Sequence, residues 1–236
     1  MTLSKLILTD NTYSSPRRSF QGIRVKNLGN IQKSLEFAKN MTFGDENSAF
    51  HRKSRSGGIE VRNQNQLFEN TFQGKLSEFI LYEYFKFHKL DSTEPDLETF
   101  GKGVWDSGDL KVQDKNINVK SIKHFSSLLL LELKDWNQEG FYIHNNQHYE
   151  FFFVVRVKLP FRDLNNYQNL EVKDFQNKIF FDIPGYITNE MLRLAIKNNH
   201  IIKQGYNLNS TKTKIDADNF YIHLNDFLPI KNFLID

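Results

Sequence analysis

Apolar residues recur at helical spacing near the start of the chain. In residues 29–41, GNIQKSLEFAKNM, Ile31, Leu35 and Ala38 fall on one side. Asn30 precedes this stripe, and asparagine is among the preferred residues at the position that caps a helix N-terminus. We therefore predict a short amphipathic helix over 29–41.

A longer apolar pattern covers residues 67–88, LFENTFQGKLSEFILYEYFKFH. Two apolar stripes at helical spacing leave little of its circumference polar, which is typical of a helix in the middle of a domain. We predict a central helix here and a loop over 42–63. A polar loop, 89–103, follows it.

Apolar runs of strand length follow in the second half of the chain. HYEFFFVVRVKL, at 148–159, has the β-branched and aromatic content of a strand buried on both faces. TNEMLRLAIKNN, at 188–199, predicts a helix. Interleaved helices and strands indicate an α/β fold with a mixed central sheet flanked by helices. The remaining predicted strands are KIFFDI, 178–183, and FYIHL, 220–224, whereas KHFSSLLLLELKDWNQEG after residue 122 is interpreted as a break.

Charge is unevenly distributed, although the net charge is only +3. Residues 1–75 hold twelve Lys and Arg against six Asp and Glu, while the rest holds nineteen against twenty-two. Basic loops suit a phosphate backbone, because each cation that contacts it releases counterions. A solvated surface loop explains the same pattern equally well. The densest basic loop is HRKSRSGGIEVR, 51–62, with Arg52, Lys53, Arg55 and Arg62.

Composition narrows the functional classes. The chain has no cysteine, which excludes disulfides, a cysteine nucleophile and thiolate metal ligands, and agrees with a reducing compartment. No run approaches the roughly 20 apolar residues of a membrane span, and the N-terminus lacks a signal-peptide pattern. We expect a cytoplasmic protein with no membrane association, folded as a single domain over 1–236.

Two short alternating segments, DLKV and INVKS, lie within residues 105–123. Alternation sends their apolar residues to the core, so that Asp109, Asn118 and Lys120 share the opposite face. A tight turn at DKN, 114–116, would pair the two segments. The three polar side chains would then converge at one edge of the sheet.

This cluster suits phosphodiester hydrolysis. Mg²⁺ takes hard oxygen ligands from one or two carboxylates plus waters, and Asp109 fits as a ligand. A lysine beside the attacking water orients it and stabilises the developing charge, which is the role expected of Lys120.

These residues resemble the PD-(D/E)XK nuclease superfamily, and within it the type II restriction endonucleases. The resemblance rests on Asp109, an eight-residue gap and NVK in the (D/E)XK position. It extends to GKLSEFILYEYF, which is similar to the core helix that precedes this hairpin in the family, with Glu78 matching the acid of that helix. Residues 70–159 are covered.

The resemblance implies a restriction-endonuclease-like catalytic core over about 67–159. It implies a Mg²⁺-dependent endonuclease that cuts double-stranded DNA at a specific sequence and works as a homodimer, since two strands need two sites. A cognate DNA methyltransferase is left open as a partner. Charge and composition, rather than the resemblance, suggest that the basic loop 51–62, within the basic N-terminal region 1–66, would clamp phosphate and that 160–236 would supply DNA recognition and dimer contacts. The alternatives are a structure-selective repair or junction nuclease of the same superfamily, or a catalytically silent DNA-binding protein on this fold.

Asn118 departs from the family pattern, which has Asp or Glu two residues before the lysine. An amide oxygen can still coordinate Mg²⁺, but without charge, so metal affinity and cleavage should fall. Three explanations stay open: a carboxylate from elsewhere replaces it, with Glu132 and Glu78 as candidates; the protein is weak or silent; or the asparagine replaces a native acid. Asp96, in EPDLE, is an alternative first acid, but its loop lacks strand character.

Overall fold

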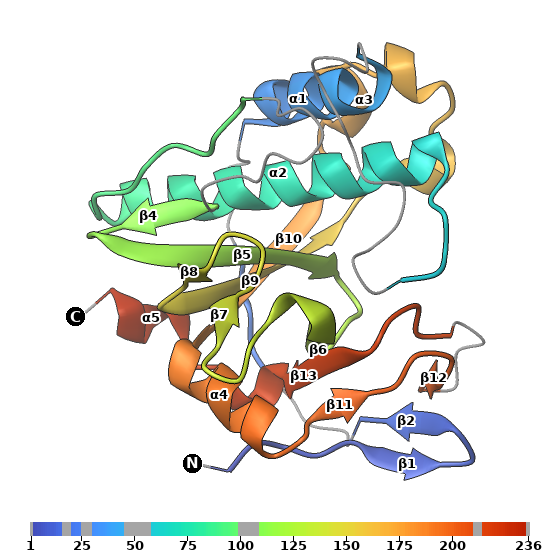
Figure 1. Ribbon diagram of the computed structural model, residues 1–236. Helices are drawn as coiled ribbons and strands as arrows, with labels where there is room; N and C mark the ends of the chain where they lie inside the picture. Colours follow the sequence, from blue (N-terminus) through green and yellow to red (C-terminus); the bar gives the residue numbers. More distant parts are fainter. Residues whose placement is uncertain are drawn as a thin grey trace.

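A computed structural model shows a layered arrangement of helices and sheets (Figure 1). Some helices lie above the central sheet, others lie below it with a smaller sheet, and the N-terminal hairpin lies at the base. The fold is therefore α/β with mixed sheets, as the sequence predicts. The structure describes residues 2–15, 20–24, 30–44, 58–98, 109–209 and 214–234.

The central sheet consists, from edge to edge, of β3 (Ile23–Arg24), β10 (Phe180–Thr188), β9 (Phe151–Lys158), β5 (Lys115–Lys123) and β4 (Leu110–Val112). β5 and β9 run parallel, whereas β4 is antiparallel to β5 and β10 is antiparallel to both β9 and β3. This mixed pairing confirms the predicted sheet type. It also leaves the β4–β5 hairpin at one end of the strand order.

Two predicted helices form near their expected positions. α1 (Ile31–Phe43) begins after Asn30, whose side chain accepts a hydrogen bond from the backbone N–H of Lys33 at 3.0 Å. α2 (Gln64–Phe87) begins three residues earlier than the apolar pattern predicts. The reason is a reciprocal cap between Asn63 and Gln66, which satisfies two N–H groups at the helix start without any apolar residue.

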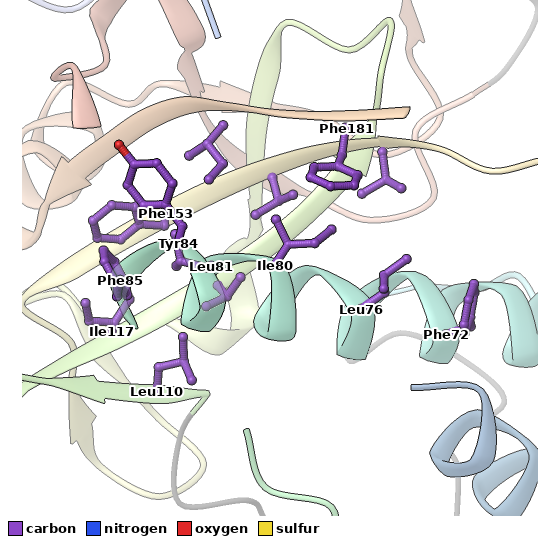
Figure 2. Packing of buried hydrophobic residues seen from close by; sticks show 14 of the residues in the cluster. Phe72, Leu76, Ile80, Leu81, Tyr84, Phe85, Leu110, Ile117, Phe153 and Phe181 are labelled. Carbon is purple, nitrogen blue, oxygen red and sulfur yellow. The ribbon is translucent and has the colours of Figure 1, made fainter. Parts of the chain in front are cut away.

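The first core lies between α2 and the central sheet (Figure 2). Phe72, Leu76 and Ile80 of α2 are fully buried there, together with Ile117 of β5 and Phe153 of β9. Burial of each such side chain contributes about 1.5–3 kcal/mol. These contacts fix α2 against the strands that carry the hairpin.

The opposite face of the central sheet is covered by a second core. Phe152 and Val154 of β9 belong to it, so β9 is buried on both faces, as predicted. The covering elements are α4 (Asn189–Lys197) and a small sheet of β11 (Ile201–Ile202), β13 (Asn219–His223) and β6 (Leu128–Glu132). The predicted helix at 188–199 is thereby confirmed, with Thr188 as its cap.

Strand β6 was not predicted. Four consecutive leucines show no alternation, and this segment is buried on both faces, so no period of two is present to detect it. The short elements were also missed, because two- to four-residue segments carry too little pattern. They are β1 (Ile7–Thr9), β2 (Thr12–Ser14), β7 (Phe141–Tyr142), β8 (Gln147–His148), β12 (Asn207–Leu208), α3 (Val172–Phe175) and α5 (Ile230–Phe233).

None of the helices within the described ranges is both long and apolar enough to cross a membrane.

Candidate functional site

The β4–β5 hairpin is closed by a two-residue turn. Gln113 and Asp114 both have positive φ, 48° and 65°, which matches the turn type that favours the natural twist of paired strands. The predicted turn at 114–116 is therefore wrong by position: Lys115 already pairs with Val112. The last residues paired between the two strands are Leu110 and Ile117. Asp109, just before β4, and Asn118, in β5, are the residues directly beyond this pair.

Asp109 is held in this register by a backbone contact. Its Oδ2 accepts a hydrogen bond from the N–H of Val119 at 2.6 Å. Burial raises the pKa of Asp109 above its ordinary value, while the nearby charge of Lys120, the Val119 N–H and the charge of Lys75 act in the opposite direction. The structure thus combines a desolvated carboxyl with two neighbouring cations.

Asn118 presents a buried oxygen without a partner. The residue is 6 % exposed, and within the described part of the chain its Oδ1 has no hydrogen-bond partner. Leaving such a group unsatisfied costs about 1–3 kcal/mol. A polar atom kept at this cost, one residue before the Val119 N–H that binds Asp109, is the kind of ligand oxygen that a bound cation would satisfy.

Lys120 lies two residues beyond Asn118 on the same strand and is partly buried. Its charge opposes the rise that burial causes in the pKa of Asp109, so the ammonium group is within electrostatic reach of that carboxylate. It nevertheless forms no ion pair with any carboxylate that the structure describes. The hairpin therefore brings Asp109, Asn118 and Lys120 together, as the alternation predicts.

A second lysine, Lys75 of α2, belongs to the same region and was missed by the sequence reasoning. It is 5 % exposed, and its Nζ donates to Oε2 of Glu78 at 2.6 Å and to the backbone oxygen of Asp96 at 2.7 Å. Nζ also lies 4.6 Å from the ring centroid of Phe37. A lysine inside an apolar stripe, three residues before an acid, is the signal that could have revealed it.

The two acids that contact Lys75 differ in whether the carboxylate itself makes the contact. Glu78 lies in the middle of α2 and directs its carboxylate at Lys75, which is itself electrostatically coupled to Asp109. The carboxylate of Asp96 accepts the N–H of Glu98 at 2.7 Å and so closes its own turn. Only the backbone oxygen of Asp96 contacts Lys75, which favours Asp109 over Asp96 as the site's first acid.

Glu132 is not brought to the hairpin face. It ends β6, where Leu129 and Leu131 point into the second core, beneath the central sheet. Leu128 belongs to a third apolar cluster on the other side of β6, and alternation places Glu132 on that side. The geometry therefore gives no support to Glu132 as the carboxylate that takes the place of Asn118 in the site.

The predicted basic loop is described only in part. Arg52, Lys53 and Arg55 lie outside the described residues. Arg62 is half-buried and directly precedes the cap of α2. The segment before it is attached to the C-terminal half of the chain, because Asp216 Oδ1 accepts the N–H groups of Ile59 and Glu60, at 3.0 and 2.9 Å.

Comparison of the chain with protein-family models, with curated proteins and with solved structures gives no match. The assignment of the site therefore depends on its own geometry.

The donor set of the hairpin suits a hard divalent cation. Its donors are the carboxylate of Asp109, which is bonded to the Val119 N–H, and the buried amide oxygen of the residue before Val119, Asn118, which has no partner in the described part of the chain. Mg²⁺ accepts such oxygens and retains several waters, so it does not require a cage of protein ligands. Within the described ranges there is no group of three His, Cys, Asp or Glu that could hold a metal. A metal at the hairpin would therefore need the amide oxygen of Asn118 as a ligand.

Proposed function

We propose that this protein is a Mg²⁺-dependent DNA endonuclease of the PD-(D/E)XK type, with a restriction-endonuclease-like core. The observation that carries the proposal is the buried Oδ1 of Asn118, which has no described partner and precedes Val119, the residue whose N–H binds Asp109. Lys120, two residues after Asn118 on the same strand, takes the place of the lysine in the (D/E)XK pattern.

Each residue has a distinct role in this proposal. Asp109 and Asn118 would hold the metal, with Glu78 nearby on α2. When bound, Mg²⁺ neutralises phosphoryl oxygens and lowers the pKa of a coordinated water. Lys120 orients the attacking water and stabilises the charge that develops on the phosphate. The Val119 N–H fixes the carboxylate of Asp109, so this ligand is oriented before substrate arrives.

Asn118 sets the expected strength of the activity. An uncharged ligand lowers metal affinity relative to a carboxylate, so cleavage by this sequence is slow. The aspartate variant, Asn118→Asp, restores the second charge with little change in shape.

The wider proposal concerns partners and recognition. The substrate is double-stranded DNA, cut at a specific sequence by a cytoplasmic homodimer of a restriction system, in which a cognate methyltransferase stays an open partner. The basic loop at 51–62 contacts phosphate, and the C-terminal region, 160–236, supplies contacts to base edges and to the second subunit. Composition motivates these assignments.

Plasmid cleavage tests the central claim. Supercoiled plasmid is incubated with Mg²⁺ and with the wild-type protein, Asn118→Asp, Lys120→Ala or Lys111→Ala. Lys111 is the matched control, because it lies on the same hairpin but is half-exposed and pairs with Asp114 at 3.4 Å. We expect discrete fragments that accumulate faster with Asn118→Asp, a loss of about 10²-fold or more with Lys120→Ala, and no change with Lys111→Ala.

The other outcomes separate the rival functions. Nicking without discrete fragments, or preference for branched substrates, indicates a structure-selective nuclease. DNA that is bound but never cut, even by Asn118→Asp, indicates a silent DNA-binding protein. Either result overturns the restriction-type assignment.

A further inference from the structure

Lys75 is a buried cation with three interactions that fix its position. Its Nζ donates hydrogen bonds to the carboxylate of Glu78 and to the backbone oxygen of Asp96, and it makes a cation–π contact with the Phe37 ring. Burying an ammonium group is costly unless it is paired and hydrogen-bonded, and here it is both. A helix of this apolar character would be more easily built with leucine at this position, so the charge itself requires an explanation.

The position of Lys75 relates it to both acids of the candidate site. It contacts Glu78 directly at 2.6 Å, and its charge also favours the ionised form of Asp109, less strongly than the charge of Lys120 does. The helix acid is therefore paired with Lys75, and the hairpin acid lies in the combined field of Lys75 and Lys120. Lys75 itself belongs to neither β4 nor β5.

The formal charges of the four ionisable side chains that the structure describes at the candidate site balance. Lys75 and Lys120 supply two positive charges, Glu78 and Asp109 supply two negative charges, and Asn118 supplies none. Sites that bind divalent cations tightly carry excess negative charge, since ligand charge sets affinity. A balanced site binds such a cation weakly until another anion joins it.

We propose that Lys75 is a positioning residue that neutralises Glu78 in the free protein and, together with Lys120, offsets the charge of Asp109, so that the divalent metal is taken up jointly with a phosphate of the substrate. This inference rests on the proposed function. The phosphate supplies the missing negative charge, and metal binding and DNA binding strengthen each other reciprocally. The protein holds little metal when no nucleic acid is present.

Removal of the Lys75 charge should uncouple metal binding from DNA binding. In Lys75→Met, Glu78 loses its counter-cation and Asp109 keeps the charge of Lys120 alone, so a divalent metal replaces the lost charge. A unit charge at close range in a protein changes affinity by more than about tenfold, so the effect is measurable. The variant Lys75→Arg keeps the charge and preserves the wild-type behaviour.

Binding of Mn²⁺, followed by the loss of free-ion signal in electron paramagnetic resonance, tests this without depending on cleavage. Wild type, Lys75→Met and Lys75→Arg are titrated with Mn²⁺ alone and with random-sequence duplex DNA, after subtraction of Mn²⁺ bound by the DNA itself. Lys33→Met is the matched control. Lys33 also holds the loop after α2, but its ion pair is with Glu94.

We expect duplex DNA to tighten Mn²⁺ binding to wild type, Lys75→Arg and Lys33→Met by about tenfold or more. We expect Lys75→Met to bind Mn²⁺ tightly without DNA. Circular dichroism checks that the variant is folded; if it is not, Lys75→Gln, which retains an N–H donor for Glu78, carries the same expectation.

Two failures are distinguishable. If every form binds Mn²⁺ with DNA but the neutral Lys75 variants bind it no better than wild type without DNA, the role of Lys75 is wrong and the nuclease proposal stands. If no form binds Mn²⁺ under either condition, the proposed function fails, and the role of Lys75 fails with it.

Discussion

The carboxylate of Asp109 accepts a hydrogen bond from the backbone N–H of Val119 on the facing strand, at 2.6 Å. A backbone donor cannot swing away, so the orientation of this acid depends on hairpin register rather than on other side chains. The two-residue turn at Gln113 and Asp114 sets that register. The chemistry of the site is therefore sensitive to changes in a turn that contacts none of its functional groups.

Replacement of Asp109 should stabilise the protein when no metal is present. Burial raises the pKa of this carboxyl above 3.8, so the folded state binds the proton more tightly than the unfolded state. Stability therefore falls as pH rises from 3.8 through the folded-state pKa and is level above it. Asp109→Asn removes this loss, and we expect its melting temperature to exceed that of wild type at neutral pH, with the difference vanishing below pH 3.8.

Thermal unfolding across this pH range, in chelator, provides the measurement. Asp114→Asn is the control, because Asp114 is exposed in the adjacent turn and should show no such pH-dependent gain. A lower melting temperature for Asp109→Asn at neutral pH would contradict the assigned burial of the charge.

The variant Asn118→Asp should trade stability for metal binding. It places a second carboxylate in a buried position, one residue before the Val119 N–H that binds Asp109, and two like charges there cost about 1–3 kcal/mol of unfolding free energy at neutral pH. Mg²⁺ should restore much of this loss, because it binds only the folded form. Urea denaturation with and without Mg²⁺ measures both effects.

The variant Asn118→Leu separates packing from ligation at the same position. It removes the buried oxygen without a described partner, so we expect equal or greater stability than wild type, by up to about 1 kcal/mol. Its stability should not respond to Mg²⁺. A response as large as that of Asn118→Asp would exclude Asn118 from the metal site.

His200 should make the fold sensitive to mild acid. Burial lowers the pKa of this ring below 6.5, and Lys5 acts in the same direction, while Asp226 opposes both. Because the folded state holds this proton less tightly than the unfolded state, stability is present above pH 6.5 and is lost as pH falls through the folded-state pKa. The ring stacks on Tyr221, with centroids 5.0 Å apart, so acid should loosen the small sheet there.

His200→Phe keeps a ring beside Tyr221 and removes the titration. We expect a flatter stability profile between pH 5 and 7 for this variant, measured by urea denaturation at about half-unit pH intervals. His88→Phe, at the exposed end of α2, should leave the profile as in wild type. Identical profiles for His200→Phe and wild type would show that His200 does not contribute.

Two phenylalanines of α2 should differ in their contribution to stability. Phe85 is fully buried against Phe153, with ring centroids 5.3 Å apart, whereas Phe87 is 82 % exposed. We expect Phe85→Ala to lower the free energy of unfolding by about 3–5 kcal/mol. Phe87→Ala should change it by less than about 0.5 kcal/mol, as surface substitutions usually do. Chemical denaturation of both variants measures the difference, and equal losses would contradict the packing of α2.

The parts of the fold that the sequence predicts are those with strong periodicity or a capping residue. α1, α4 and β9 lie close to their expected bounds, because Asn30 and Thr188 cap the helices and β9 is a continuous apolar run. β6 escaped prediction, since its leucines serve two cores and carry no alternation. Short edge strands depend on tertiary pairing that local pattern does not encode.

The candidate site divides in the same way. Asp109, Asn118 and Lys120 were predictable together, because strand alternation and one turn determine their relationship. Lys75 pairs with Glu78 one helical turn away, which the sequence could have shown, but its burial and its bond to Asp96 depend on packing against a loop 21 residues away in sequence. Glu132 is suggested only by its distance along the chain. Alternation along β6 places it on the side of the third apolar cluster, away from the second core.

The two faces of β9 belong to different cores, with Phe153 against α2 and Phe152 against the small sheet. β9 is thus shared by both hydrophobic cores, and β5, with the candidate site, pairs directly with it. Neither half of the molecule can unfold alone without exposing one face of β9. Loss of the site should therefore coincide with global unfolding, and damage to the distant N-terminal hairpin should leave the site intact.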